Sequence, residues 1–417
     1  MAGRTCITRA VNMNDLSPDL GGKFGFSQRL IEAARDQSRV KGLTHEFYRY
    51  PARFSPNFVR GAIEAFTRPG DWVVDPFVGG GTTLVESMAM GRNALGIDIS
   101  SLSAFLCEAK TQILSDHDVS AFARWMERID ETINMHAPSE RHNAYADAGY
   151  YRNLDGPEFW RLRKAIEQAV SSVERLRRKQ AHVLARCAVL KTAQWALDSR
   201  KTRPSVKAFK AQMYKQSGLM LKASLEFRDQ VNGLDLAVPP RAISLNRTTA
   251  GAERVKAVAD ICPPKLIVTS PPYPGIHVLY HRWQVDGRKE APAPFWIAGK
   301  LDGAGLSYYT LGDRKNPGLQ TYFDNLKSTF TSVAAMAGDE TTVVQMVAFS
   351  KPEWQLPKYL EVMEDCGLEE YRPWEVALDD EDGRLWRDVP NRRWHAHQKS
   401  HAPGAREVVL VHRKART

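Results

Sequence analysis

From Asp71 onward, short apolar runs alternate with stretches in which apolar residues recur every three or four positions. "DWVVDPF" and "NALGIDI" have the composition of buried strands, "TTLVESMAMG" and "SSLSAFLCEAKTQIL" have helical periodicity, and the turn "VGGG" joins the first strand to the first helix. This order of strand, helix, strand and helix predicts a parallel sheet that is covered by helices.

Residues 115–240 interrupt this alternation with long helical patterns, and we expect this block to be an insertion. The alternation then resumes with strands at "RAISL", "KLIVTS" and "TTVVQMVAF", helices at "LQTYFDNLKSTFTSVAAMA" and from Trp354, and two late strands at "YRPWEVAL" and "REVVLVHR". The pattern therefore predicts an α/β fold with a mostly parallel sheet, an antiparallel C-terminal pair and a large helical insertion.

The composition is that of an ordinary globular protein, for which we expect a cytoplasmic location. Of the 417 residues, 43% are hydrophobic and 25% are charged. No apolar run approaches the ~20 residues that a membrane span needs, and the N-terminal residues lack a signal-peptide pattern. Neither a disulfide framework nor a metal site is expected, because no two cysteines form a C-x-x-C pair. The five are Cys6, Cys107, Cys187, Cys262 and Cys366.

The positive charge of the chain is concentrated in one segment. The formal net charge is +10, and residues 161–230 contain 17 Lys or Arg against 5 Asp or Glu, so this segment alone carries +12. A polyanionic partner such as nucleic acid would explain this concentration, and the alternative is a solvated basic helical face.

The turn "DPFVGGGTT" has the composition of a ligand-binding turn between a strand and a helix. Its glycines, Gly79 to Gly81, let the backbone approach a ligand, and the start of the following helix favours a negative group. Asp98 ends the next strand, where a carboxylate can accept hydrogen bonds from both hydroxyls of a ribose. A nucleoside cofactor is therefore expected, although the G-x-G-x-x-G pattern fails at Leu84 and a tight turn without a ligand is the alternative.

A second motif, "TSPPY", stands where another strand must end, because prolines offer no N–H to a sheet. Its position at the carboxyl end of a strand should make it face the glycine turn. The Ser270 hydroxyl and a carbonyl fixed between Pro271 and Pro272 could accept hydrogen bonds from the amino group of a base and free its lone pair for attack. The ring of Tyr273, rather than its hydroxyl, is expected to stack on a base that has swung out of its helix. A rigid strand end with a packed tyrosine is the alternative.

With both motifs present, the chain resembles the S-adenosylmethionine-dependent DNA amino-methyltransferases, the N4-cytosine and N6-adenine enzymes of restriction–modification systems. "DPFVGGGTT" is similar to their cofactor motif, "TSPPY" to their catalytic motif, and "YPARFSPNFVRGAI" to a segment that closes over the methionine part of the cofactor. The resemblance covers roughly residues 45–114 and 240–415 and implies a Rossmann-like methyltransferase fold. It also implies S-adenosylmethionine as cofactor and double-stranded DNA as partner, and it leaves open a cognate restriction endonuclease.

The resemblance also implies a set of site residues. Those expected to bind the cofactor are Tyr50, Pro51, Arg53, Phe54, Asp75, Pro76, Phe77, Gly79, Gly81, Thr82, Thr83, Asp98 and Ile99, and those expected to hold the target base are Ser270, Pro271, Pro272 and Tyr273. After the third strand, where the family usually has an acidic residue near the adenine ring, this chain offers only Asn246.

The expected organisation follows from these assignments. We expect an N-terminal extension over residues 1–44, the cofactor-binding half over 45–114, the basic helical insertion over 115–240, and the catalytic half over 241–417. Both the insertion and the aromatic loop 276–318 are candidates for DNA recognition. We expect phosphate contacts mainly from the insertion, at residues such as Arg175, Arg177, Arg178 and Lys179, and base contacts mainly from the loop.

Several functions share these motifs. Because serine precedes the prolines here, whereas adenine enzymes generally have Asp or Asn, we expect methylation of cytosine at N4 by base flipping, with N6-adenine methylation as the alternative. Methylation of an RNA amino group or of a protein glutamine amide would use the same chemistry. A binding protein on an inactive methyltransferase fold is disfavoured because both motifs are intact. Methylation at C5 would need a cysteine in a proline–cysteine setting, and Cys262 stands in the reverse order, before the strand.

Overall fold

The computed structural model describes residues 23–415 apart from residues 37, 39, 52, 140, 201, 262, 276–281, 288, 304–308, 313–315, 374–381 and 389–405. Within these described parts, no helix combines the length and the apolar character that crossing a bilayer would need.

The main sheet has the strand order β3-β2-β1-β4-β7-β10-β8, with β9 paired to β10. Its strands are β1 Trp72–Asp75, β2 Asn93–Asp98, β3 Ala242–Asn246, β4 Leu266–Thr269, β7 Thr342–Ala348, β8 Leu368–Glu370, β9 Leu385–Asp388 and β10 Arg406–Lys414. The first five in this order are parallel, and β10 runs antiparallel to its three neighbours β7, β8 and β9. The predicted mixed α/β sheet, mostly parallel with antiparallel C-terminal strands, is confirmed.

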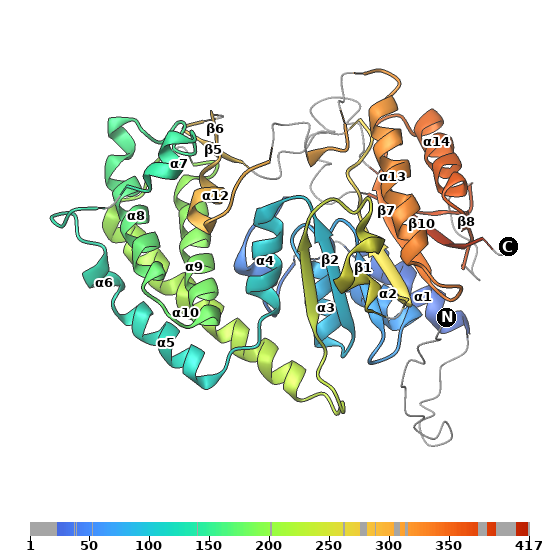
Figure 1. The fold of residues 1–417 in the computed structure, drawn as a ribbon, viewed down its shortest axis with the longest axis horizontal. Coiled ribbons are helices and arrows are strands. Elements are labelled where there is room, and N and C mark those ends of the chain that lie inside the picture. The colour runs from blue at the N-terminus through green and yellow to red at the C-terminus, as the bar shows by residue number, and fades with distance from the viewer. Residues whose placement is uncertain are drawn as a thin grey trace.

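Helices cover both faces of the sheet because alternate strand residues point to opposite sides (Figure 1). Val73 and Leu266 face α1 (Lys23–Arg35) and α2 (Pro56–Phe66), and these elements share one apolar cluster. Val74 and Ile267, the next residue of each strand, pack in the cluster that contains α13 (Gln320–Met336) and α14 (Pro352–Asp365). This two-sided burial explains the nearly continuous apolar runs in the sequence.

The helices α3 (Thr82–Ala89) and α4 (Ser101–Thr111) follow β1 and β2 directly. The insertion begins after α4 and returns to the sheet at β3. Its helices are α5 Asp116–Glu127, α6 Ile129–Thr132, α7 Asn143–Asp147, α8 Trp160–Glu174, α9 Lys179–Leu197 and α10 Val206–Asn232. Short helical segments elsewhere are η1 His45–Phe47, η2 Pro157–Phe159, η3 Ala252–Arg254 and α11 Lys256–Ala259.

The segment after the catalytic motif packs into the helical insertion. It forms a small hairpin, β5 (Trp283–Val285) and β6 (Lys289–Ala291), followed by α12 (Ala293–Ala298). Trp283, Phe295 and Trp296 are buried in the same apolar cluster as α5, α8 and α9, and Figure 1 shows the hairpin and α12 beside α7, α8 and α9. The two segments that we considered as separate DNA-binding candidates therefore share one core.

Two details of the strand prediction differ from the structure. The expected strand "YRPWEVAL" begins at Tyr371, but residues 371–373 are not in a strand and 374–381 lie outside the described residues. The antiparallel partners of β10 at this end of the sheet are instead β8 and β9. A strand of three or four residues has too few positions to show a clear alternation, so neither was found from the sequence.

Candidate active site

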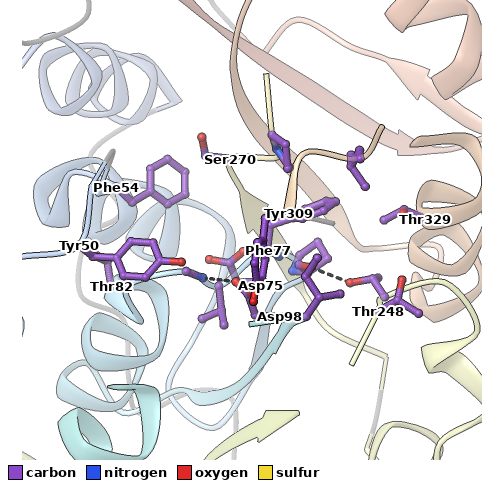
Figure 2. Close-up of a pocket in the computed structure, with 18 of the residues that line it drawn as sticks. Tyr50, Phe54, Asp75, Phe77, Thr82, Asp98, Thr248, Ser270, Tyr309 and Thr329 are labelled. Atoms are coloured by element: carbon purple, nitrogen blue, oxygen red, sulfur yellow. Dashed lines mark hydrogen bonds between the residues drawn. The ribbon is translucent and has the colours of Figure 1, made fainter. Parts of the chain in front are cut away.

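A pocket lies at the carboxyl ends of β1, β2 and β4, where the strand order reverses and α/β sheets commonly bind ligands. Figure 2 shows side chains from both halves of the sheet around this pocket. Its lining residues are Tyr50, Arg53, Phe54, Asp75, Pro76, Phe77, Val78, Gly79, Gly80, Thr82, Asp98, Ile99, Arg247, Thr248, Thr249, Ser270, Pro272, Tyr273, Tyr309, Leu311 and Thr329.

The glycine turn is shaped by the residues that pack against it. Gly79 has φ +47, and a Cβ atom there would lie 3.3 Å from Cε1 of Tyr50. A Cβ atom on Gly80 would lie 3.2 Å from Cβ of Tyr50, so the segment before α2 closes directly over the turn. From the other side, the buried ammonium of Lys110 donates to the carbonyl of Gly80. Burial lowers the pKa of Lys110 to about 8.

Asp98 connects the end of β2 to the glycine turn. Its carboxylate accepts hydrogen bonds from the backbone N–H groups of Gly79 at 2.9 Å and Ser100 at 2.8 Å. Burial raises the pKa of Asp98, and these hydrogen bonds act in the opposite direction because they favour the ionised form. Each carboxylate oxygen has a second lone pair, so Asp98 can also accept hydrogen bonds from a ligand in the pocket.

Asp75, at the end of β1, is held by three donors. Its carboxylate accepts from the hydroxyl of Thr83 at 2.6 Å, the hydroxyl of Thr269 at 2.8 Å and the backbone N–H of Phe77 at 3.1 Å. Burial raises the pKa of Asp75 to about 6 in spite of these hydrogen bonds. The same group thus fixes the start of α3 and the last residue of β4, which directly precedes Ser270.

The Ser-Pro-Pro-Tyr corner is fixed by hydrogen bonds from neighbouring elements. The hydroxyl of Tyr322, on α13, donates to the carbonyl of Pro272 at 2.7 Å. The hydroxyl of Ser350 donates to the carbonyl of Pro274 at 3.2 Å. These contacts hold the backbone where it leaves β4, so the corner is rigid at the rim of the pocket.

The hydroxyl of Tyr273 has a larger part in the site than the sequence suggested. It lies 3.0 Å from Oγ of Ser270 and donates to Oε1 of Glu407 at 2.7 Å. Glu407 in turn forms an ion pair with Arg387, with Nη2 and Oε2 2.7 Å apart. We expected only the ring of Tyr273 to act, and the structure gives its hydroxyl a defined position next to Ser270.

Most of the predicted site residues line the pocket, and four do not. Thr83 instead holds Asp75, and Gly81 packs on Cys107, whose Sγ would lie 3.1 Å from a Cβ atom at that glycine. The side chains of Pro51 and Pro271 do not line it either. Asn246 also lies outside the lining, because its amide donates to the backbone carbonyls of Asp98 and Ile99.

Gly80, one of the three glycines of the predicted turn, also lines the pocket, and the sequence did not single out several other lining residues, namely Val78, Arg247, Thr248, Thr249, Tyr309, Leu311 and Thr329. Thr248 and Thr249 follow β3, and their place after a parallel strand was a usable signal. Thr249 donates to the carbonyl of Pro76 at 2.6 Å, which joins this loop to the glycine turn. Tyr309 comes from the loop after the catalytic motif, and its hydroxyl donates to Asp302 at 2.6 Å.

The basic turn between α8 and α9 contributes no residue to the lining of this pocket. Arg178 pairs with Asp118 at the start of α5, and Lys179 pairs with Glu108 in the last turns of α4. The other end of α9 approaches the pocket, since Gln194 accepts from the backbone N–H of Arg49, the neighbour of Tyr50.

Two of the five cysteines lie buried in the core. Cys107 and Cys187 are buried free thiols, and burial raises the pKa of each to about 12. A thiol with so high a pKa is protonated at neutral pH and is a poor nucleophile. Cys6 and Cys262 lie outside the described residues.

Comparison with known proteins bears on part of the chain. Residues 27–103 match the family model described as DNA methylase of the N6/N4 type. The type II methyltransferase M.MjaII of Methanocaldococcus jannaschii is 41% identical over 93 residues, which are 22% of this chain and 17% of that protein. M.BsoBI of Geobacillus stearothermophilus is 36% identical over 91 residues, 21% of this chain and 17% of that protein. The DNA adenine methyltransferase YhdJ of Escherichia coli is 38% identical over 66 residues, 16% of this chain and 22% of that protein.

This chain thus covers about a fifth of the length of these relatives. A solved structure of the rRNA methyltransferase aviRa from Streptomyces viridochromogenes aligns over 89% of this chain and 90% of its own, with a TM-score of 0.31 and 9% identity, values too low to support an inference. The matched segment 27–103 contains the glycine turn, Asp75 and Asp98. Over this segment the chain matches the N6/N4 DNA methylases, the family that its motifs indicated.

Proposed function

We propose that the protein transfers a methyl group from S-adenosylmethionine to N4 of a cytosine that is flipped out of duplex DNA. The observation that carries this proposal is the shared pocket of the two motifs, with Asp98 on one side and Ser270 and Tyr273 on the other. A DNA methylase segment supports the same chemistry. The proposed reaction needs a nucleoside cofactor and a base amino group to meet, and this pocket offers groups for both.

The pocket fits S-adenosylmethionine in the chemistry of its lining. The cofactor supplies an electrophilic methyl group on a sulfonium. Asp98 would accept hydrogen bonds from the ribose hydroxyls, while Phe77 and Ile99 offer apolar contact to the adenine ring. Arg53, which lines the pocket next to Tyr50, would pair with the carboxylate of the methionine part.

The chemistry at the corner follows from the properties of an exocyclic amine. Its lone pair is shared with the ring, which makes it a poor nucleophile. A hydrogen bond from the amine to Oγ of Ser270, and another to the carbonyl between the prolines, would draw the nitrogen toward a tetrahedral geometry. Its lone pair would then attack the methyl carbon, the carbon–sulfur bond would break, and the amine would lose a proton to water.

Target selection rests on the ring of Tyr273 and on the length of Ser270. Enzymes that modify a base take it out of the stack, and an aromatic face at the corner would support the flipped base. The short serine hydroxyl suits a pyrimidine that is drawn close, which favours cytosine. N6-adenine methylation is the alternative, and the similarity to YhdJ, a DNA adenine methyltransferase, keeps it in consideration.

The helical insertion and the hairpin β5–β6 would hold the duplex as one unit, because they share a core. Two arginines follow the end of α9 that contacts Arg49, namely Arg200, which stacks on Trp195 at 4.2 Å, and Arg203, which stacks on Phe159 at 4.3 Å. We therefore place phosphate contacts at this end of α9 and base contacts in the loop 276–318, of which residues 276–281, 288, 304–308 and 313–315 lie outside the described part. A cognate endonuclease would be a further partner in the cytoplasm.

Transfer of a labelled methyl group from S-adenosylmethionine to duplex DNA, RNA or total protein tests the proposed class of substrate. We expect label in duplex DNA. Label in RNA or protein alone would show that DNA is not the substrate. It would favour methylation of an RNA amino group or of a protein glutamine amide.

A further inference from the structure

We propose that Glu407 sets the direction of a hydrogen-bond chain through Tyr273 to Ser270, so that the Ser270 hydroxyl accepts hydrogen bonds from the target and selects an amino group over a carbonyl. Glu407 acts through Tyr273 and is therefore a positioning residue. This inference rests on the proposed function, because it concerns the base held at the same corner.

The chain begins at a buried ion pair. Glu407, on β10, and Arg387, on β9, are 6% and 9% exposed. Nε and Nη2 of Arg387 lie 2.8 and 2.7 Å from Oε2 of Glu407, and Nη1 donates to the carbonyl of Ala34 at 3.0 Å. The guanidinium of Arg387 can only donate hydrogen bonds, so the carboxylate of Glu407 is the acceptor in this pair. An ionised carboxylate can only accept hydrogen bonds.

The direction of the next two hydrogen bonds follows from the acceptor role of Glu407. Oε1 of Glu407 is 2.7 Å from the hydroxyl of Tyr273, which must donate its single proton to the carboxylate. The tyrosine oxygen is 3.0 Å from Oγ of Ser270, and only the serine can supply the proton in that contact. The Ser270 proton is thus committed to Tyr273, and the serine oxygen is left with lone pairs for the pocket.

A hydroxyl restricted in this way distinguishes two kinds of base. The amino group of cytosine or adenine offers N–H donors, which suit a lone pair on Ser270. The carbonyl of uracil, thymine or hypoxanthine offers lone pairs at the same place, and two acceptors facing one another repel. A freely rotating serine could instead donate to the carbonyl. The chain would therefore convert serine, which can both donate and accept, into an acceptor.

The test compares duplexes in which the methylated base is replaced by its carbonyl analogue, uracil for cytosine or hypoxanthine for adenine. The methylated site is first located with the wild-type enzyme, and the affinities for the two duplexes are then measured with cofactor present. We expect the wild-type enzyme to prefer the amino base. In Glu407→Gln, the amide can donate to Tyr273 and reverse the chain, so the preference should fall by about tenfold or more and kcat should fall with it.

Tyr273→Phe provides a second variant, because it keeps the buried ion pair of Glu407 and removes only the hydroxyl between it and Ser270. Its preference for the amino base should fall as well, even if Glu407→Gln fails to fold. Glu369→Gln, at an exposed position on β8, is the matched control and should retain the wild-type preference.

The outcomes separate the two proposals. If the wild-type enzyme methylates DNA but folded Tyr273→Phe and Glu407→Gln both keep the wild-type preference, the proposed role of Glu407 is wrong. The proposed function would stand in that case. If Glu407→Gln has lower activity but keeps its preference for the amino base, Glu407 has only a structural role. Absence of methyl transfer by the wild-type enzyme would overturn the proposed function, and this inference with it.

Discussion

The hydroxyl of Thr269 donates a hydrogen bond of 2.8 Å to the buried carboxyl group of Asp75. Thr269 is the last residue of β4 and precedes Ser270, while Asp75 is the last residue of β1 and precedes the glycine turn. The ends of two strands that are 194 residues apart in the chain are therefore joined through one side chain. This contact sets the two motifs side by side before any ligand binds.

The raised pKa of Asp75 predicts a characteristic dependence of stability on pH. In the unfolded chain the carboxyl group ionises near its ordinary pKa of 3.8, whereas in the folded protein it keeps its proton up to about pH 6. Folding thus binds a proton in this window, so the contribution of Asp75 to stability is fully present below pH 3.8 and is lost as the pH rises through 6. A shift of this size corresponds to roughly 3 kcal/mol.

Denaturant unfolding of the wild type and Asp75→Asn between pH 4 and 7 would measure this effect. The free energy of unfolding of the variant, relative to that of the wild type, should increase by up to about 3 kcal/mol as the pH rises to 6 and then level off. A difference that stays constant across this range would show that Asp75 does not carry a raised pKa.

Replacement of Asp98 should weaken cofactor binding. Asp98→Ala removes the proposed acceptor for the ribose and the acceptor that orders Gly79 and Ser100, and hydrogen bonds to charged groups contribute roughly 1.5–3 kcal/mol. Calorimetric titration with S-adenosylmethionine should show a loss of this size. Asp260→Ala, at an exposed position before β4, serves as the control. Unchanged affinity in folded Asp98→Ala would place the ribose contact elsewhere.

Removal of the Ser270 hydroxyl should affect turnover and leave cofactor binding intact. Ser270→Ala takes away one preorganised acceptor for the target amine, which should cost about 2–4 kcal/mol of transition-state stabilisation. Single-turnover kinetics with saturating cofactor would measure this loss. Tyr273→Ala should in addition lose about 1–3 kcal/mol of stacking with the target base. Full activity in Ser270→Ala would rule out the proposed role of the serine.

DNA binding should weaken steeply with salt, because each neutralised phosphate adds about −0.9 to the slope of log affinity against log salt. Arg200 and Arg203 follow the end of α9 that contacts Arg49, so replacing both with glutamine should flatten this slope by up to about 1.8. The pair Arg175→Gln and Arg177→Gln, in the turn between α8 and α9, should change it less. A larger change of the slope in the Arg175 and Arg177 variant would indicate that the phosphate contacts lie in the basic turn, as the sequence first suggested.

Sequence patterns were sufficient for the parts of the fold that depend on local chemistry. The strands around Val73 and Leu266 show as apolar runs because they are buried on both faces, and the glycine turn shows because Gly79 must leave room for Tyr50. The position of Asp98 after the second strand was enough to place it at the pocket. These features are set by neighbours along the chain or by the general rules of parallel sheets.

Contacts between distant segments could not be anticipated in the same way. Glu407 reaches Tyr273 across 134 residues, and a glutamate just before the apolar run Val408 to Val411 gives no sign of its partner. The packing of Trp283 and Trp296 into the helical insertion joins two segments that the sequence presented as separate. Tyr309 enters the pocket from a loop whose path is set by its contacts rather than by its own pattern.

Nucleoside mass analysis of DNA treated with the purified protein and S-adenosylmethionine tests the central claim most directly. The arrangement of Ser270 and Tyr273 opposite Asp98 predicts that N4-methylcytosine forms, and that Ser270→Ala forms it far more slowly under the same conditions. N6-methyladenine as the sole product would keep the amino-methyltransferase chemistry and contradict the choice of base. DNA that carries neither modified nucleoside after treatment with folded, cofactor-binding protein would contradict the proposed function.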